Sequence, residues 1–167
     1  MGTEPRPFQI LLAEDSAADV TLVRMALQND GLDHVLHVAR DGAEAIAFIE
    51  KADGDREVPG PDLLLLDIHL PKYSGGEILK RLRSTELYAE TPVVVLTSSD
   101  APQDRECAQR LAARCYFNKP PRLDEFMQLG VIVRDILTGK EPLALRHTGK
   151  EPLVLGLAGP GTRGGAA

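Results

Sequence analysis

Tryptophan is absent from this chain of 167 residues, and aromatic residues make up only 4% of it. The core must therefore be built mainly from aliphatic side chains. No apolar run approaches the roughly 20 residues of a membrane-spanning helix, and no charged N-terminal stretch is followed by a long apolar one. We therefore expect a cytoplasmic protein that carries no secretory signal and has no membrane partner.

Cysteine is also scarce, and basic residues are outnumbered by acidic ones. Two cysteines, Cys107 and Cys115, are too few for a disulfide framework, and we expect both to act as small apolar groups in a reducing compartment. Lys and Arg number 19 against 25 Asp and Glu, which gives a net charge of −6. An acidic chain lacks the basic surface of nucleic-acid-binding proteins, so no nucleic-acid partner is expected.

Five short apolar segments alternate with segments of helical periodicity. The apolar segments are residues 8–13, 35–39, 63–66, 93–96 and 115–118, and the helical ones lie around 16–29, 42–49, 75–82, 104–113 and 123–137. Residues 63–66 are apolar at every position, which is typical of a strand covered on both faces. The alternation predicts an α/β fold with a doubly wound, five-stranded parallel sheet, in which ligands bind beyond the carboxyl ends of the strands.

Polar side chains follow four of these apolar segments directly. Glu14 and Asp15 follow the first, Asp67 the third, Thr97 the fourth and Lys119 the fifth. Because the carboxyl ends of parallel strands meet at one edge of a sheet, we expect all five side chains to converge there. Three carboxylates in one place repel each other, and a hard dication such as Mg²⁺, which takes oxygen ligands, relieves that repulsion.

A carboxylate cluster beside a lysine and a hydroxyl suits phosphoryl transfer. Asp67 can act as a nucleophile towards a phosphoryl group. The metal, Lys119 and Thr97 would then neutralise or hydrogen-bond the phosphoryl oxygens. The product is an acyl phosphate, whose new charge Thr97 and Lys119 would sense.

In this order the residues resemble the receiver domain of two-component response regulators, a CheY-like fold, over residues 8 to 137. The motifs that carry the resemblance are Glu14-Asp15, Asp67 with Leu70-Pro71 and Gly75, Thr97, and Lys119-Pro120. The resemblance implies the flavodoxin-like strand order 2-1-3-4-5 and makes Asp67 the phosphoacceptor. It also implies that Mg²⁺, or Mn²⁺ or Ca²⁺ in crystals, is held by Glu14, Asp15, Asp67 and the backbone carbonyl of His69.

The resemblance assigns switch roles to residues after the fourth and fifth strands. Thr97, with Ser98 beside it, is the switch hydroxyl, and Lys119 is the phosphate-binding lysine. Tyr116 is the switch aromatic, whose ring turns inward when Thr97 moves towards the phosphate and so changes a partner surface. The peptide bond before Pro120 is expected to be cis.

Three segments, residues 14–19, 40–45 and 67–77, resemble the small single-domain regulators encoded beside bacterial and cyanobacterial phytochrome kinases. A sensor histidine kinase, of the phytochrome type, is therefore the expected partner. Glu14 stands where many receivers have Asp, and its longer side chain can hold the metal through a water molecule. His69 is also unusual two residues after the phosphoacceptor, where its side chain lies near the attack path and bears on dephosphorylation.

Other functions fit the sequence less well. Phosphotransferases and phosphatases of the haloacid-dehalogenase type need a second Asp two residues after the nucleophile, where this chain has His69. A flavin-binding module needs a hydroxyl- and glycine-rich loop after the first strand, where Glu14 and Asp15 would repel a phosphate. A receiver-like binding module that does not use phosphorylation remains the alternative. We expect no turnover of an external substrate, and an output through protein contacts or phosphate relay.

The composition changes after the last expected helix. Residues 1–7 are expected to form an N-terminal extension, 8–138 the receiver domain and 139–167 an extended C-terminal arm. Residues 138–145 and 148–155 are near repeats, and the Pro in each excludes helix. Apolar side chains of the arm are costly to leave in water, so we expect the arm to pack on a second protomer and form a homodimer. These side chains are Leu143, Leu145, Leu153, Leu155 and Leu157.

Overall fold

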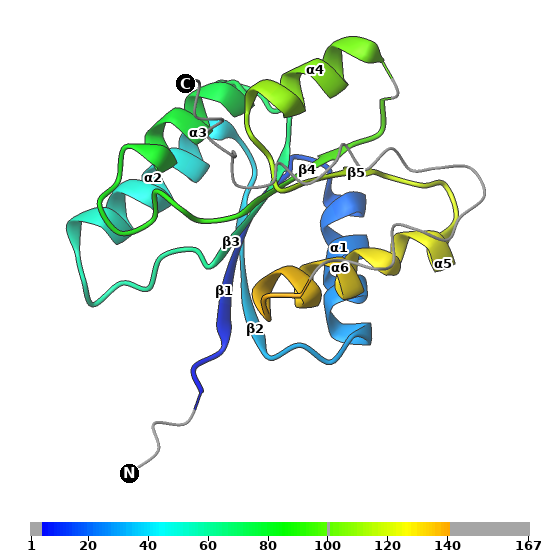
Figure 1. Ribbon diagram of the computed structural model, residues 1–167, viewed down its shortest axis with the longest axis horizontal. Coiled ribbons are helices and arrows are strands. Elements are labelled where there is room, and N and C mark those ends of the chain that lie inside the picture. Colours follow the sequence, from blue (N-terminus) through cyan, green and yellow to red (C-terminus); the bar gives the residue numbers. More distant parts are fainter. Residues whose placement is uncertain (1–4, 100, 141–167) are drawn as a thin grey trace, which may run out of the picture.

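A computed structural model of the protein describes residues 5–99 and 101–140. Five strands form one sheet: β1 (Phe8–Ala13), β2 (His34–Ala39), β3 (Leu63–Asp67), β4 (Val93–Thr97) and β5 (Cys115–Asn118). All neighbouring strands pair in parallel, in the order β2-β1-β3-β4-β5. The predicted doubly wound α/β fold and its strand order are confirmed (Figure 1).

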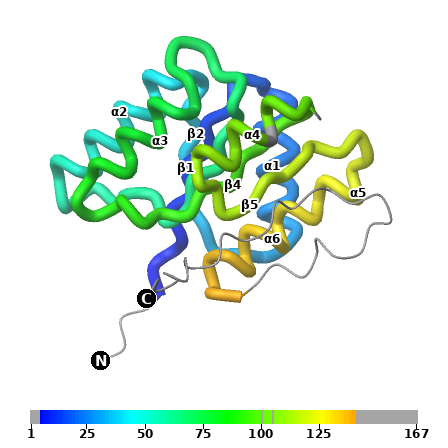
Figure 2. Tube along the Cα trace, turned by 45° about the horizontal axis from the view of Figure 1, so that its top comes forward, coloured from blue at the N-terminus to red at the C-terminus, as the bar shows by residue number. Residues whose placement is uncertain are grey.

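Six helices connect and follow the strands within the described residues. They are α1 (Ala17–Asn29), α2 (Gly42–Gly54), α3 (Gly75–Arg83), α4 (Pro102–Arg110), α5 (Leu123–Phe126) and α6 (Gln128–Leu137). The helices lie in two layers on the two faces of the sheet, with α1, α5 and α6 on one face and α2, α3 and α4 on the other (Figures 1 and 2).

The two layers have separate aliphatic cores because side chains alternate along each strand. Ile10 and Leu12 of β1 pack in the core under α1 and α6, whereas Leu11 and Ala13 pack in the core under α2 and α3. Every residue of β3 is buried. The sheet is therefore covered on both faces, as the continuous apolar run of β3 predicts.

The single helix expected over residues 123–137 is divided in two at Met127, which is a correction to the sequence-based prediction. Met127 has a ψ of −18°, and Gly130 donates its N–H to the Met127 carbonyl three residues back. This is the tighter hydrogen bonding of a 3₁₀ turn. At the other end of α6, Gly139 has a φ of +75° and Lys140 donates to the Asp135 carbonyl, which together form the expected glycine stop.

Three helices begin at side-chain caps. Ser16 and Asp41 cap α1 and α2, and Ser74 forms a reciprocal capping box with Glu77 in α3. The caps of α1 and α2 closely follow the ends of β1 and β2, so each helix starts near the carboxyl edge of the sheet. This arrangement brings the first turn of α1 to the same edge as the polar residues after the strands.

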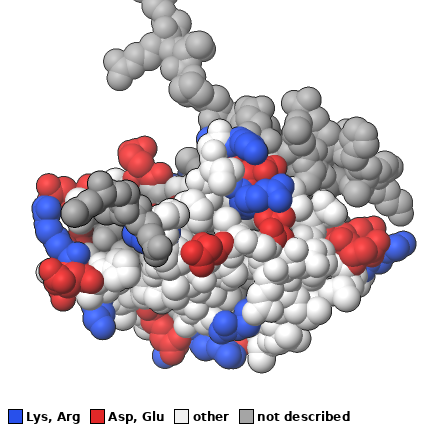
Figure 3. All heavy atoms as spheres, turned by 90° about the horizontal axis from the view of Figure 1, so that it is seen from below, with Lys and Arg blue, Asp and Glu red and all other residues white. Residues whose placement is uncertain are grey.

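No helix within the described part of the chain is long and apolar enough to cross a bilayer. On the face seen in Figure 3, Lys and Arg side chains lie interspersed with Asp and Glu. The predicted arm, with Leu143, Leu145, Leu153, Leu155 and Leu157, lies outside the described residues.

Candidate functional site

Three carboxylates meet at the carboxyl edge of the sheet, as predicted. In the sheet, β1 lies beside β3 with Ala13 opposite Leu66, so the residues that follow Ala13 come close to Asp67. Each of Glu14, Asp15 and Asp67 has an oxygen within 4.8 Å of the others. We call these three residues the acidic cluster. Glu14 is fully buried, Asp67 is 7% exposed and Asp15 is exposed, so the cluster opens to solvent on the Asp15 side.

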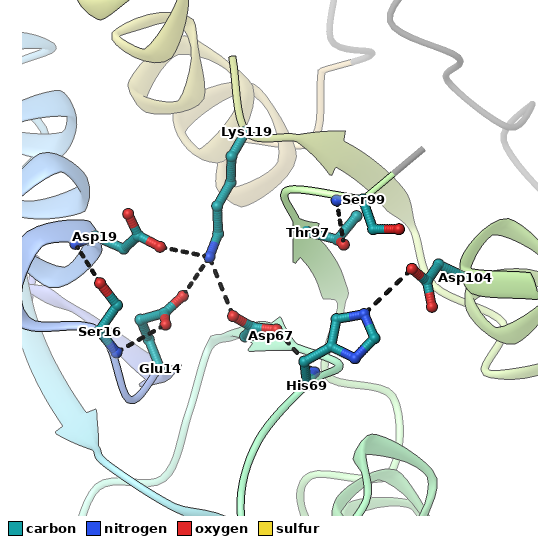
Figure 4. Close-up of polar contacts among 9 residues, drawn as sticks. All are labelled: Glu14, Ser16, Asp19, Asp67, His69, Thr97, Ser99, Asp104 and Lys119. Atoms are coloured by element: carbon teal, nitrogen blue, oxygen red, sulfur yellow. Dashed lines mark hydrogen bonds and ion pairs between the residues drawn. The ribbon is translucent and has the colours of Figure 1, made fainter. Parts of the chain in front are cut away.

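The side chain of Lys119 extends from the end of β5 into this cluster (Figure 4). Three carboxylate oxygens surround its ammonium nitrogen: Glu14 Oε2 at 2.6 Å, Asp19 Oδ2 at 2.8 Å and Asp67 Oδ2 at 3.1 Å. The three N–H groups of the ammonium are thus matched by three acceptors. The predicted approach of Lys119 to Asp67 is confirmed, over a sequence separation of 52 residues.

Asp19 contacts Lys119 in the candidate site, and the sequence analysis did not assign it to this site. It lies in the first turn of α1, and its backbone N–H donates to Ser16 Oγ at 3.3 Å. The sequence does contain a signal for Asp19. Ser16, directly after Glu14-Asp15, can cap a helix, and the residue three positions after such a cap lies near the same strand end. That spacing does not tell whether its carboxylate turns towards the sheet, so the contact with Lys119 depended on the tertiary structure.

Burial and charge shift the pKa values of the buried pair. Burial raises the pKa of Glu14 to about 7, although the hydrogen bonds from Lys119 and from the Ser16 N–H act to lower it. Burial acts to lower the pKa of Lys119, but hydrogen bonds to Asp19 and Glu14 and the charge of Asp67 outweigh it and raise that pKa well above its ordinary value. The ammonium therefore stays charged, and burial favours the protonated form of Glu14 more than that of an ordinary carboxyl.

The Asp67 carboxylate is fixed by two donors. Its Oδ1 accepts the backbone N–H of His69 at 2.8 Å, and its Oδ2 accepts Lys119. The imidazole of His69 lies 3.2 Å from Asp104 Oδ2 in the first turn of α4, with 59% of its side chain exposed (Figure 4). The pKa of Asp104 is held below its ordinary value, mainly by a hydrogen bond with Ser99 and further by His69. The connection after the phosphoacceptor candidate is therefore in direct contact with α4.

Thr97 and Tyr116 are both joined to Ser99. Thr97 is fully buried at the end of β4, and its Oγ1 accepts the Ser99 N–H at 3.1 Å. Tyr116 is 3% exposed, and its hydroxyl donates to the Ser99 carbonyl at 2.8 Å. Ser98, which the sequence analysis groups with Thr97 at the switch, is exposed. The connection between β4 and α4 is thus held by the two residues that the sequence analysis assigns to the switch.

The expected cis peptide bond before Pro120 is not found. Residues 5–99 and 101–140 contain no cis peptide bond, so the bond between Lys119 and Pro120 is trans. Trans is the lower-energy form of such a bond. With it, Lys119 still donates its backbone N–H to the Thr97 carbonyl at 2.7 Å and still places its ammonium among the carboxylates. The local geometry therefore does not require the cis form.

The donor set of the acidic cluster fits a hard divalent cation. All three side chains offer carboxylate oxygens, the ligand type that Mg²⁺ and Ca²⁺ prefer, and they lie close enough to share one ion. The exposed side at Asp15 leaves room for water ligands. Within this cluster the Asp67 carboxylate has the Lys119 ammonium 3.1 Å away, so the carboxylate can act as a nucleophile and the ammonium can stabilise a phosphoryl group.

Comparison with known proteins places this geometry in a family. The profile of the "Response regulator receiver domain" matches residues 10–129. The response regulator Rcp1 of Synechocystis sp. is 37% identical over 123 residues, which are 74% of this chain and 84% of that protein. The Mn²⁺-bound structure of Rcp1 superposes with a TM-score of 0.66 at 36% identity, covering 77% of this chain and 93% of that one.

Two further solved structures are similar. The phosphorylated cyanobacterial phytochrome response regulator RcpA has a TM-score of 0.69 at 32% identity, covering 79% of this chain and 94% of that one. The bacteriophytochrome response regulator AtBRR has a TM-score of 0.60 at 33% identity, covering 74% and 90%. Sequence profile, sequence relatives and fold agree, and the chain belongs to the receiver-domain family of response regulators.

Proposed function

We propose that Asp67 accepts a phosphoryl group from a sensor histidine kinase of the bacteriophytochrome type, and that the protein then changes its contacts with other proteins. The observation that carries the proposal is the position of Lys119, 3.1 Å from the Asp67 carboxylate and beside the acidic cluster. An ammonium and a divalent cation on two sides of one carboxylate provide the positive charge that a transferred phosphoryl group needs.

The chemistry assigns a role to each group. The Asp67 carboxylate forms an O–P bond while the P–N bond of the kinase phosphohistidine breaks, and the leaving imidazole nitrogen keeps the electron pair. Lys119 hydrogen-bonds a phosphoryl oxygen. Glu14, Asp15, Asp67 and the backbone carbonyl of His69 would hold Mg²⁺, which when bound neutralises charge on the phosphoryl oxygens. The protein supports its own phosphorylation and dephosphorylation and turns over no separate substrate.

The output follows from the hydrogen bonds of Ser99. A phosphoryl group on Asp67 attracts the Thr97 hydroxyl, which in the structure accepts the Ser99 N–H. Loss of the Thr97 bond removes one of the hydrogen bonds that hold Ser99, and the connection between β4 and α4, to which Tyr116 also bonds, becomes freer to move. The surface of α4 and β5 then presents a different face to a partner.

The phytochrome-type kinase, a cytoplasmic location and a homodimer are further parts of the proposal. RcpA and AtBRR, two structures similar to this chain, are phytochrome response regulators. The homodimer rests on the apolar side chains of residues 139–167. Light scattering of the full chain and of a chain ending at Thr138 tests it: the shorter chain should be a monomer, and equal dimerisation of the two would contradict the role of the arm.

The phosphoacceptor is tested by incubating the protein with its kinase, radiolabelled ATP and Mg²⁺. The wild type and the control Asp124→Asn, which removes an exposed acid paired with Arg122, should both become labelled. Asp67→Asn should not. Label on Asp67→Asn would contradict the assignment. A wild type that binds its partner equally well with and without phosphorylation would instead favour a binding module independent of phosphate.

A further inference from the structure

We propose that Asp19 is a positioning residue for Lys119, which holds the ammonium against Asp67 from the first turn of α1. The inference rests on the proposed function, because it takes Asp67 as the phosphoacceptor. It assigns a role to a carboxylate that lies outside the acidic cluster.

Asp19 differs from the other two partners of Lys119 in what else it can bind. Within residues 5–99 and 101–140, the acids close enough to share a cation are Glu14, Asp15 and Asp67, and Asp19 is not among them. A bound cation therefore draws on oxygens of Glu14 and Asp67. The carboxylate of Asp19, 2.8 Å from the ammonium, remains available to Lys119 alone.

The backbone fixes the place of Asp19. Its N–H donates to Ser16 Oγ at 3.3 Å, and the Ser16 N–H donates to Glu14 Oε1 at 3.0 Å. These bonds tie the first turn of α1 to the end of β1, so the backbone of Asp19 is held in place beside the acidic cluster. The side chain of Asp19 is 28% exposed, whereas that of Lys119 is 7% exposed. Asp19 thus holds a buried ammonium from the solvent side of the site.

Lys119 needs such a partner because its stem is flexible. A lysine ammonium is a point charge at the end of four methylene groups and has no preferred plane. Its three acceptors determine where the charge lies, and a hydrogen bond to Asp19 is foremost among the interactions that raise the pKa of Lys119. Without Asp19, the remaining acceptors of the Lys119 ammonium are Glu14 and Asp67, which both belong to the acidic cluster. A cation that binds their oxygens would then also displace the ammonium.

The direction in which removal of Asp19 changes anion binding distinguishes a positioning role from a purely electrostatic one. Asp19 carries a negative charge near the place where a negative phosphoryl group must bind. If it acted only through that charge, its removal would relieve repulsion and tighten the binding of an anion. If it positions Lys119, its removal weakens the binding of the anion.

The experiment measures two dissociation constants, for Mg²⁺ alone and for beryllofluoride at saturating Mg²⁺. Misplacing a positioned group by 1 Å can lower a reaction rate on the order of a hundredfold. Because two acceptors of Lys119 remain, we expect a smaller effect, in which Asp19→Ala weakens beryllofluoride binding by about tenfold. The effect on Mg²⁺ should stay within about threefold, the scale of a modest change in nearby charge. Asp19→Glu, which keeps a carboxylate, should restore most of the beryllofluoride binding, and Asp124→Asn should behave as wild type.

A double variant tests whether Asp19 acts through Lys119. In a Lys119→Ala background, Asp19→Ala should cause no further weakening of beryllofluoride binding, because the group it positions is gone. Unchanged or tighter beryllofluoride binding by Asp19→Ala alone would overturn the proposal. Equal weakening for Mg²⁺ and beryllofluoride would also overturn it, because Asp19 would then be a metal ligand.

A readout on the metal-free protein does not depend on phosphate. The Lys119 ammonium, with three acceptors, should give a slowly exchanging ¹⁵N–¹H signal in the wild type and in Asp19→Glu, and lose it in Asp19→Ala. If Asp19→Ala does not fold, Asp19→Asn takes its place, with an intermediate loss because its amide is a neutral acceptor. An unchanged signal would contradict the proposal. Failure of the wild type itself to bind beryllofluoride would instead contradict the proposed function.

Discussion

Replacing Lys119 by Met should destabilise the metal-free protein far more than the same change at an exposed lysine. The side chain of Lys119 is 7% exposed, and the side chains of its partners Glu14 and Asp67 are 1% and 10% exposed. Removing one partner of a buried ion pair costs on the order of 3 to 5 kcal/mol, because it leaves an uncompensated charge out of water. We expect a loss of about 3 kcal/mol in the free energy of unfolding at pH 8, at the lower end of this range because the site opens to solvent at Asp15.

The matched control is Lys72→Met. Lys72 makes an ion pair of 2.7 Å with Asp41, but its side chain is 63% exposed, so the change should cost less than about 1 kcal/mol. The cost at Lys119 should also depend on pH. Because the pKa of Glu14 is raised to about 7, this carboxyl is largely protonated at pH 5.5, and the loss of its counter-ion then matters less.

Urea unfolding of the three proteins without metal, at pH 8 and pH 5.5, measures these free energies. The reasoning predicts a large gap between the two variants at pH 8 and a smaller gap at pH 5.5. Equal losses for Lys119→Met and Lys72→Met at pH 8, or a stabilised Lys119→Met, would refute it.

Three other predictions concern separate parts of the molecule. Because the pKa of Glu14 is raised to about 7, a cation must displace a proton from this carboxyl below that pH. Calorimetry should therefore show that the affinity for Mg²⁺ falls from pH 8 to pH 6, by at most about tenfold per pH unit. A constant affinity would argue against Glu14 as a ligand. Burial raises the pKa of Cys115 to about 12, so a thiol reagent at pH 8 should modify Cys107 in the native protein and reach Cys115 only on unfolding. A Cβ on Gly130 would clash with the Ala26 carbonyl oxygen, so Gly130→Ala should force α1 and α6 apart and lower the free energy of unfolding in urea by about 2 kcal/mol. An unchanged midpoint would contradict the close approach.

The sequence predicted the fold and most of the site because both depend on where strands end. Residues 63–66 are apolar throughout, which indicates a central strand, and the polar residue after each strand must then lie at one edge of the sheet. This argument brought together Asp67 and Lys119, which are 52 residues apart. It needed only the order of strands and no side-chain geometry.

Other features depend on how side chains turn and how helices pack. The Asp19 carboxylate turns towards Lys119 because of the orientation of α1, and His69 reaches Asp104 because α4 lies over the connection after β3. The break at Met127 was not predicted, because neither Met127 nor its two neighbours in the chain is Pro or Gly and residues 123–137 follow one continuous helical pattern. The isomer before Pro120 was also beyond sequence reasoning, since the two forms of such a bond differ by only about 1 kcal/mol.

Chemical trapping tests the central claim most directly. The protein is incubated with acetyl phosphate and Mg²⁺ and then with sodium borohydride, which reduces an acyl phosphate of aspartate to homoserine, and peptide mass spectrometry locates the change. We predict homoserine at position 67, only when Mg²⁺ is present. Conversion at Glu14, Asp15 or another acid, or no conversion in protein shown to be folded, would contradict the assignment of Asp67.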